Sequence, residues 1–142
     1  MEWILKPKVS IGPLKFGMSR NDVHRIFGEP DQIIDHTKSE TPSFYERYRQ
    51  RGFNLCFKGN FITNELLSVD MVSGNVVKTE DGDVLFPVCI HRLLSTCPMD
   101  IKEEWRHGAS IYKSYKNAIC AIVDDKDFYA IRFSAHKEIK KK

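Results

Sequence analysis

Apolar and polar residues alternate along much of this chain, and a period of two is typical of a strand that buries one face. In the clearest case, over 53–58, Phe53, Leu55 and Phe57 fall on one face. Alternation of this kind, or enrichment in β-prone residues, predicts seven strands. They are expected over 31–37, 43–49, 53–58, 66–72, 111–115, 118–123 and 128–134. The chain should therefore contain a large amount of antiparallel sheet.

A helix is predicted over 19–27, where Val23, Ile26 and Phe27 follow the i, i+3, i+4 spacing of an apolar stripe. A second helix is predicted over 88–97, after a proline and before another. The segment 1–10 is expected to be an extended lead-in, and 73–82 a polar connection. Over 66–72, the residues expected to join the buried sheet face are Leu67, Val69 and Met71.

The first helix has clear end signals. Ser19 is a good N-cap, because its hydroxyl can accept a hydrogen bond from the unpaired amides of the first turn. Gly28 is placed to close the helix with a positive φ angle, and Pro30 prevents its continuation. Arg20 and His24 lie off the apolar stripe and are expected to face water.

The order helix then strands occurs twice, about 70 residues apart. The sequence therefore predicts an α+β fold of two helix-plus-antiparallel-sheet units in tandem, with the helices packed on one sheet face. The units are expected over 1–74 and 75–136 within one compact domain, followed by a basic tail over 137–142. Each sheet would bury one face under its helix and leave the other open.

Charge and cysteine content limit the classes of partner and the cellular compartment that we expect for this chain. The chain has 22 basic and 19 acidic residues, and the tail alone holds four lysines and one glutamate, which leaves 18 of each sign in the body. A neutral body argues against a nucleic-acid partner. No secretory signal and no membrane-spanning run is visible, so we expect a cytoplasmic protein. The cysteines are expected to be thiols: Cys56, Cys89, Cys97 and Cys120.

Motifs for catalysis or for cofactor and metal binding are missing from the sequence. The five histidines are scattered without metal-ligand spacing, and no GxSxG, GxGxxG or phosphate loop occurs. Asp70 is expected on a sheet face, where it pairs with Arg47 or Arg49 or, alternatively, acts as a general acid. Asp124 to Asp127 are expected to form a turn rather than a calcium loop. We therefore expect no enzyme, cofactor or metal.

The open sheet faces offer material for binding. Tyrosine and arginine are the residue types that most often anchor protein interfaces, and several stand at outward positions of the predicted strands. The expected partner-binding residues are Tyr45, Arg47 and Arg49 in the first half, and Ile122, Phe128 and Arg132 in the second. Any of them could instead belong to the core.

The run from Leu14 to Pro30 resembles the motif that opens an α/β unit in the β-lactamase inhibitor protein superfamily. Small lipoproteins of the outer-membrane barrel-assembly machine share this motif. The matching residues are Phe16, Gly17, Met18, Ser19, Val23 and Gly28. The inhibitor contains two such units in tandem, so the resemblance implies the same arrangement here. This chain carries the motif once.

Small α+β proteins with such motifs are also similar to many immunity proteins, which neutralise a toxin. The resemblance thus implies a protein-binding module, an immunity protein that occludes a cognate toxin domain through an exposed sheet face. The alternative is an adaptor or assembly factor that self-associates into a homodimer through exposed sheet surface. An enzyme ranks third.

Overall fold

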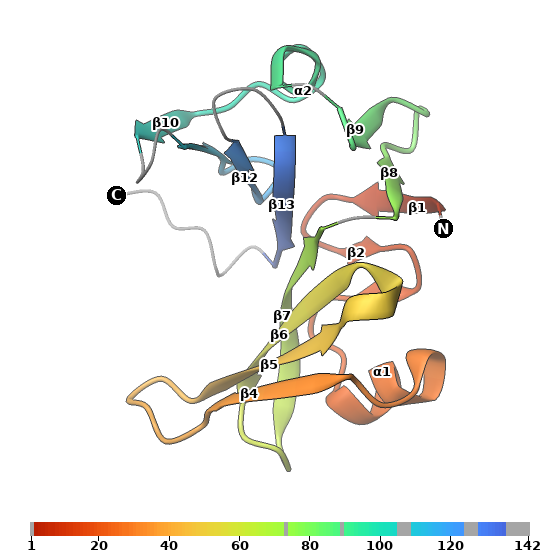
Figure 1. The fold of residues 1–142 in the computed structure, drawn as a ribbon, viewed down its shortest axis with the longest axis vertical. Helices are drawn as coiled ribbons and strands as arrows, with labels where there is room; N and C mark the ends of the chain where they lie inside the picture. Colours follow the sequence, from red (N-terminus) through yellow and green to blue (C-terminus); the bar gives the residue numbers. More distant parts are fainter. Residues whose placement is uncertain (1, 73, 89, 105–108, 124–127, 136–142) are drawn as a thin grey trace.

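The fold is mostly β. The computed structural model describes residues 2–72, 74–88, 90–104, 109–123 and 128–135, with the side chains at 128 and 129 excepted. Within these residues the strands form one sheet of eight and one of five, accompanied by two short α-helices. The expected α+β pair of helix-plus-sheet units is therefore wrong (Figure 1). The predicted turn from Asp124 to Asp127 and the basic tail over 137–142 lie outside the described residues.

The order of the strands in space differs from their order along the chain. The eight-stranded sheet comprises, from one edge to the other, β10 (Ile101–Glu104), β11 (Ser110–Ser114), β12 (Ile119–Val123), β13 (Phe128–Ser134), β7 (Asn64–Met71), β6 (Phe53–Gly59), β5 (Ser43–Tyr48) and β4 (Gln32–His36). The five-stranded sheet comprises β3 (Leu14–Lys15), β2 (Ser10–Ile11), β1 (Glu2–Lys6), β8 (Val76–Lys78) and β9 (Val84–Phe86). The helices are α1 (Arg20–Phe27), α2 (Ile90–Thr96) and the 3-10 turn η1 (Arg49–Arg51).

The two halves of the chain share the larger sheet. Strand β13 pairs antiparallel with β7, and this pairing places Arg132 opposite Asp70 and Phe133 opposite Val69. The strands of both halves thus form one continuous antiparallel sheet, with β4 at one edge and β10 at the other. The pairing of β13 with β7 overturns the predicted tandem arrangement, because the long strands of the two halves form one shared sheet rather than a separate sheet in each half.

The smaller sheet contains segments that the sequence pattern indicated to be connections. Strand β1 pairs in parallel with β8, with Trp3 opposite Val77. The Trp3 indole nitrogen also donates a hydrogen bond to Asn75 Oδ1 at 3.1 Å. The predicted lead-in over 1–10 and the predicted connection over 73–82 therefore meet as neighbouring strands. Three-residue strands such as β8 are too short to produce a readable alternation.

Helix α1 forms as its end signals predict. The Ser19 hydroxyl accepts a hydrogen bond from the Asp22 amide at 3.2 Å, and Gly28 ends the helix with φ +79°. Val23 and Phe27 are buried, but Ile26 is 44% exposed, so its predicted place in the apolar stripe is wrong. A helix of two turns buries only a narrow stripe of its surface, and here one side chain from each turn, Val23 and then Phe27, occupies that stripe.

An aromatic cluster joins α1 to both sheets. The Phe27 ring lies 5.8 Å from that of Trp3 on β1, 5.0 Å from Phe53 on β6 and 6.1 Å from Tyr48 on β5, measured between ring centroids. Phe53 and Trp3 are almost wholly buried. This cluster supplies the packing that holds the helix against the layers on either side.

A bulge changes the inward face of β7. The register shifts between Cys56 and Phe57, so that Cys56 pairs with Ser68 and Phe57 pairs with Leu66. Leu67 is the extra residue, and it is only partly buried whereas Leu66 is fully buried. The predicted inward place of Leu67 is therefore wrong, because the bulge interrupts strict alternation.

The second predicted helix, over 88–97, is confirmed as α2, with Leu93 buried and Cys97 buried just after its end. It contacts β9 of the smaller sheet, and Cys97 just after it accepts a hydrogen bond from Asn117 between β11 and β12. Among the described residues, no helix has the length and apolar character required to cross a membrane.

Replacing Phe27 by Ala should lower the free energy of unfolding by about 3–5 kcal/mol, because it empties the centre of the aromatic cluster. Urea unfolding measures this value. The matched control is Ile26→Ala on the same helix, which should cost less than about 1 kcal/mol because the side chain is exposed. Equal losses for the two variants would contradict this packing.

Candidate functional site

The outward face of the eight-stranded sheet carries one row of mostly polar side chains. Directly paired residues of neighbouring strands point to the same face, so the register identifies the row. From β4 to β11 its members are Gln32, Arg47, Asn54, Asp70, Arg132, Cys120 and Lys113. The alternate residues on the other side of the same strands build the core. The row is therefore the centre line of the exposed sheet face.

Asp70 and Arg132 form an ion pair at the middle of this row. Arg132 Nε donates to Asp70 Oδ1 at 2.7 Å and Arg132 Nη2 donates to Oδ2 at 3.2 Å, a two-pronged geometry. The predicted pairing of Asp70 with Arg47 or Arg49 is wrong, because β13 lies beside β7 and brings a closer arginine.

Arg47 and Arg49 converge on one neutral acceptor. Arg49 Nη2 donates to Gln32 Oε1 at 2.9 Å, and Arg47 Nη1 lies 3.4 Å from the same oxygen. Within the part of the chain that the structure describes, neither guanidinium forms an ion pair. The nearby Asp31 carboxylate instead accepts a hydrogen bond from the Arg49 amide at 2.7 Å.

Two adjoining hollows follow the row. The larger, about 300 Å³, is lined by Asn54, Asp70, Val72, Ile111, Lys113, Cys120, Ile122, Ala130, Ile131 and Arg132. The smaller, about 170 Å³, is lined by Arg47, Arg49, Gly52, Phe53, Asn54 and Val72. They share Asn54 and Val72, and together they form what we call the sheet-face groove. The groove has an arginine end and an apolar end.

The structure brings most of the predicted binding residues together. Arg47, Arg49, Ile122 and Arg132 all line the sheet-face groove, although they come from both halves of the chain. Tyr45 lies on the same face, two residues before Arg47, but does not line the groove. Burial, and next the neighbouring Cys56, raise the pKa of its hydroxyl.

The last predicted residue, Phe128, begins β13 opposite Val123, and its side chain lies outside the described residues. Sequence reasoning missed Asn54 and Val72, which connect the two hollows. A signal for Asn54 exists in the alternation over 53–58, which puts this residue on the face opposite Phe53, Leu55 and Phe57.

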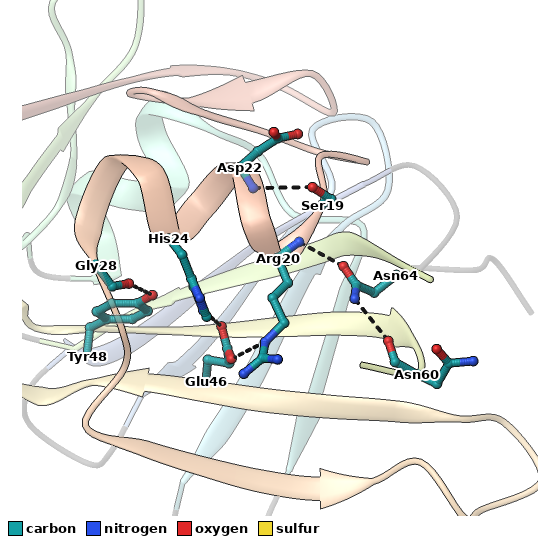
Figure 2. A network of polar contacts seen from close by, with 9 residues as sticks. All are labelled: Ser19, Arg20, Asp22, His24, Gly28, Glu46, Tyr48, Asn60 and Asn64. Atoms are coloured by element: carbon teal, nitrogen blue, oxygen red, sulfur yellow. Dashed lines mark hydrogen bonds and ion pairs between the residues drawn. The ribbon is translucent and has the colours of Figure 1, made fainter. Parts of the chain in front are cut away.

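A second polar arrangement lies on the inward side of β5, and Figure 2 shows it. Glu46 is completely buried. Arg20 Nε donates to Glu46 Oε2 at 2.8 Å, and His24 Nε2 lies 2.8 Å from Oε1 (Figure 2). The Arg20 guanidinium also lies over the rings of Phe44 and Phe61. Each carboxylate oxygen thus has a partner on α1.

This cluster holds α1 on the sheet. The amide of Arg20 donates to Asn64 Oδ1 at 2.7 Å, so the start of the helix is tied to β7 as well. The expectation that Arg20 and His24 face water is wrong, because both turn toward a buried charge. Glu46 was missed, although a charged residue at an inward position between Phe44 and Tyr48 was its signal.

Tyr48 fixes the other end of the helix. Its hydroxyl donates to the Gly28 carbonyl oxygen at 2.8 Å (Figure 2). Burial is the main cause that raises the pKa of this hydroxyl above its ordinary value of 10.0. The neutral phenol is therefore the form that the folded protein favours.

Metal-ligand chemistry is not apparent in the described part of the chain, where no group of three or more His, Cys, Asp or Glu residues could hold an ion. Cys56, Cys97 and Cys120 carry thiols that are not joined in disulfides. Cys89 lies outside the described residues.

Comparisons with protein-family models, curated proteins and solved structures find no match to this chain. The resemblance of residues 14–30 to the inhibitor superfamily therefore stays a prediction.

Replacing Glu46 by Gln should lower the free energy of unfolding by about 2–3 kcal/mol, because Arg20 and His24 lose their contacts with a buried carboxylate. Chemical unfolding at neutral pH measures the loss. The control is Glu40→Gln on an exposed loop, which should leave stability unchanged. If Glu46→Gln lowered the free energy of unfolding no more than the control does, the stabilising role of the Glu46 contacts with Arg20 and His24 would be contradicted.

Replacing Tyr48 by Phe should cost about 1 kcal/mol at pH 7 through the lost hydrogen bond. Above pH 10 the phenol ionises in the unfolded chain but stays neutral in the folded one, so Tyr48 reduces stability as the pH rises. The free energy of unfolding, measured between pH 9 and about pH 12, should therefore decrease less steeply with pH for the variant than for the wild type. Parallel curves would show that Tyr48 titrates normally.

Proposed function

We propose that this chain is a protein-binding module whose partner occupies the sheet-face groove. The observation that carries the proposal is the convergence of Arg47, Arg49, Ile122 and Arg132, from three strands and η1, on two adjoining hollows that share Asn54 and Val72. Exposed apolar side chains beside arginines are typical of the centre of protein interfaces.

Apolar surface at the groove supports binding by burial. Val72, which both hollows share, is 45% exposed. Ile111 and Ile122 are only partly buried, although they lie on a sheet with a well-filled core on its other face. Covering such side chains releases about 25 cal/mol per Å² of apolar area. A partner would gain this contribution without any rearrangement of the sheet.

We propose an immunity protein as the specific form of this function, with a toxin domain as the partner and occlusion as the mechanism. Its support is the resemblance of the motif over 14–30 together with the accessible groove. We propose the cytoplasm as the place of the interaction, because Cys56, Cys97 and Cys120 are not joined in disulfides, which suits a reducing compartment.

Self-association is the second candidate, and the sheet edge favours it. Among the described strands, β4 is outermost and pairs with β5 alone, and its Ile33 is 42% exposed. An outermost strand has unpaired backbone groups that a second copy can extend. The partner would then be an identical chain.

Replacing Ile122 by Asp should abolish partner capture, because it places a charge in the apolar end of the groove. The purified protein serves as bait in a lysate of its source cells, and mass spectrometry identifies what it retains. The matched control is Ile62→Asp, since Ile62 is 94% exposed and lies outside the groove. The wild type and the control should retain the same stoichiometric protein, and the groove variant should lose it.

Unchanged capture by the Ile122→Asp variant would contradict the groove as the binding surface. If that variant unfolds, Val72→Asp replaces it, because the Val72 side chain is exposed. Recovery of the bait alone, together with a dimer mass in solution, would favour self-association over binding of another protein.

A further inference from the structure

The strongest unexplained feature of the groove is its charge. Its cationic side chains are Arg47, Arg49, Lys113 and Arg132. Asp70 pairs with Arg132, and Glu103 lies 3.5 Å from the Lys113 ammonium. Within the described residues, Arg47 and Arg49 have no such carboxylate. The Asp31 carboxylate at this end accepts from the Arg49 backbone amide rather than from a guanidinium, so no ion pair among the described residues balances the two guanidinium charges.

We infer that the groove binds an acidic protein segment, which presents a carboxylate to Arg47 and Arg49 and an aliphatic side chain to the apolar end. This inference rests on the proposed function and names its partner class. A carboxylate is the matching ligand because the planar guanidinium fork donates two parallel hydrogen bonds to it.

The geometry of the arginine pair calls for an anion. Both guanidinium groups point at Gln32 Oε1, so two like charges are held close together around a neutral oxygen. Like charges at short range repel, and an amide oxygen carries only a partial negative charge. A carboxylate placed beside the Gln32 side chain would be attracted to both groups at once. Its binding would relieve the repulsion that the free protein carries.

Local structure fixes the two arginines in this arrangement. Arg47 is the direct cross-strand partner of Gln32 on β4. Arg49 begins η1, where its amide is held by Asp31 Oδ2. The turn ends at Gly52, whose φ of +76° reverses the chain into β6. The side chains are thus presented from a short, tethered corner, which reduces the entropy lost on binding.

The sheet spacing sets the length of the segment. From β5 to β12 the row crosses four strand intervals, or roughly 19 Å at about 4.8 Å each. An extended peptide that crosses the strands covers this distance in about six residue steps. Side chains an even number of steps apart point to the same face, so the acidic and the aliphatic side chain should lie at positions 1 and 7 of a heptapeptide. Asn54, between the two hollows, can donate to or accept from its backbone.

The probe is the heptapeptide Glu-Thr-Ser-Thr-Ser-Thr-Leu, capped at both ends, and its isostere carries Gln in place of Glu. Binding to the full chain is followed by NMR at 0.15 M salt, through the Nε–H signals of the arginines and the amide signals of Asn54 and Val72. The Glu peptide should shift these signals and bind about tenfold more tightly than the Gln peptide.

Arginine variants test the assignment directly. Arg47→Gln and Arg49→Gln should each weaken binding of the Glu peptide by about three- to tenfold, and leave the weaker Gln peptide almost unaffected. The matched control is Arg25→Gln, because Arg25 lies on α1, outside the groove, and contacts only Asp22 in an exposed pair. The control should bind the Glu peptide like the wild type.

Three results would overturn the inference. The first is equal affinity for the Glu and Gln peptides. The second is tighter binding of inorganic phosphate or of a ten-nucleotide oligo-dT, which would assign the arginine pair to phosphate. The third is full capture of the lysate partner by the Arg47→Gln, Arg49→Gln double variant when Ile122→Asp has lost it. That third result would leave the groove as the binding surface and exclude only the acidic partner.

Discussion

The antiparallel pairing of β13 with β7 is the contact on which the rest of the structure depends. It joins four strands from each half into one sheet and sets Arg132 against Asp70. Without this joint the larger hollow would not form beside the smaller one, since its lining comes from β11 to β13 on one side of the joint and from β6 and β7 on the other. The candidate binding surface is thus a product of long-range strand pairing.

The position of Arg47 on the outer face of the sheet depends on the contacts of Glu46 on the inner face. Side chains of a strand alternate between faces, so Glu46 and Arg47 must point in opposite directions. The contacts of Glu46 with Arg20 and His24 hold β5 in one register under α1. The same register puts Arg47 beside Gln32. A polar clamp in the interior thereby positions a cation on the surface.

Local signals in the sequence were sufficient for local structure. Ser19, Gly28 and the alternation in β6 and β12 act within a few residues, and they predicted the capped helix and the outward faces of these two strands. They could not predict which strands pair, because Asp70 and Arg132 are 62 residues apart and the pattern of one strand does not identify its neighbour in the sheet. Outward positions of Arg47 and Ile122 were therefore predictable, whereas the groove that they share was not.

The central position of β7 has a consequence for the growing chain. On the ribosome β7 emerges next to β6, while its other neighbour, β13, lies about sixty residues downstream. At synthesis rates of about 5–20 residues per second, this edge stays unpaired for roughly 3–12 s. The seam that is innermost in the finished sheet is thus an open edge during translation, when other nascent chains can pair with it.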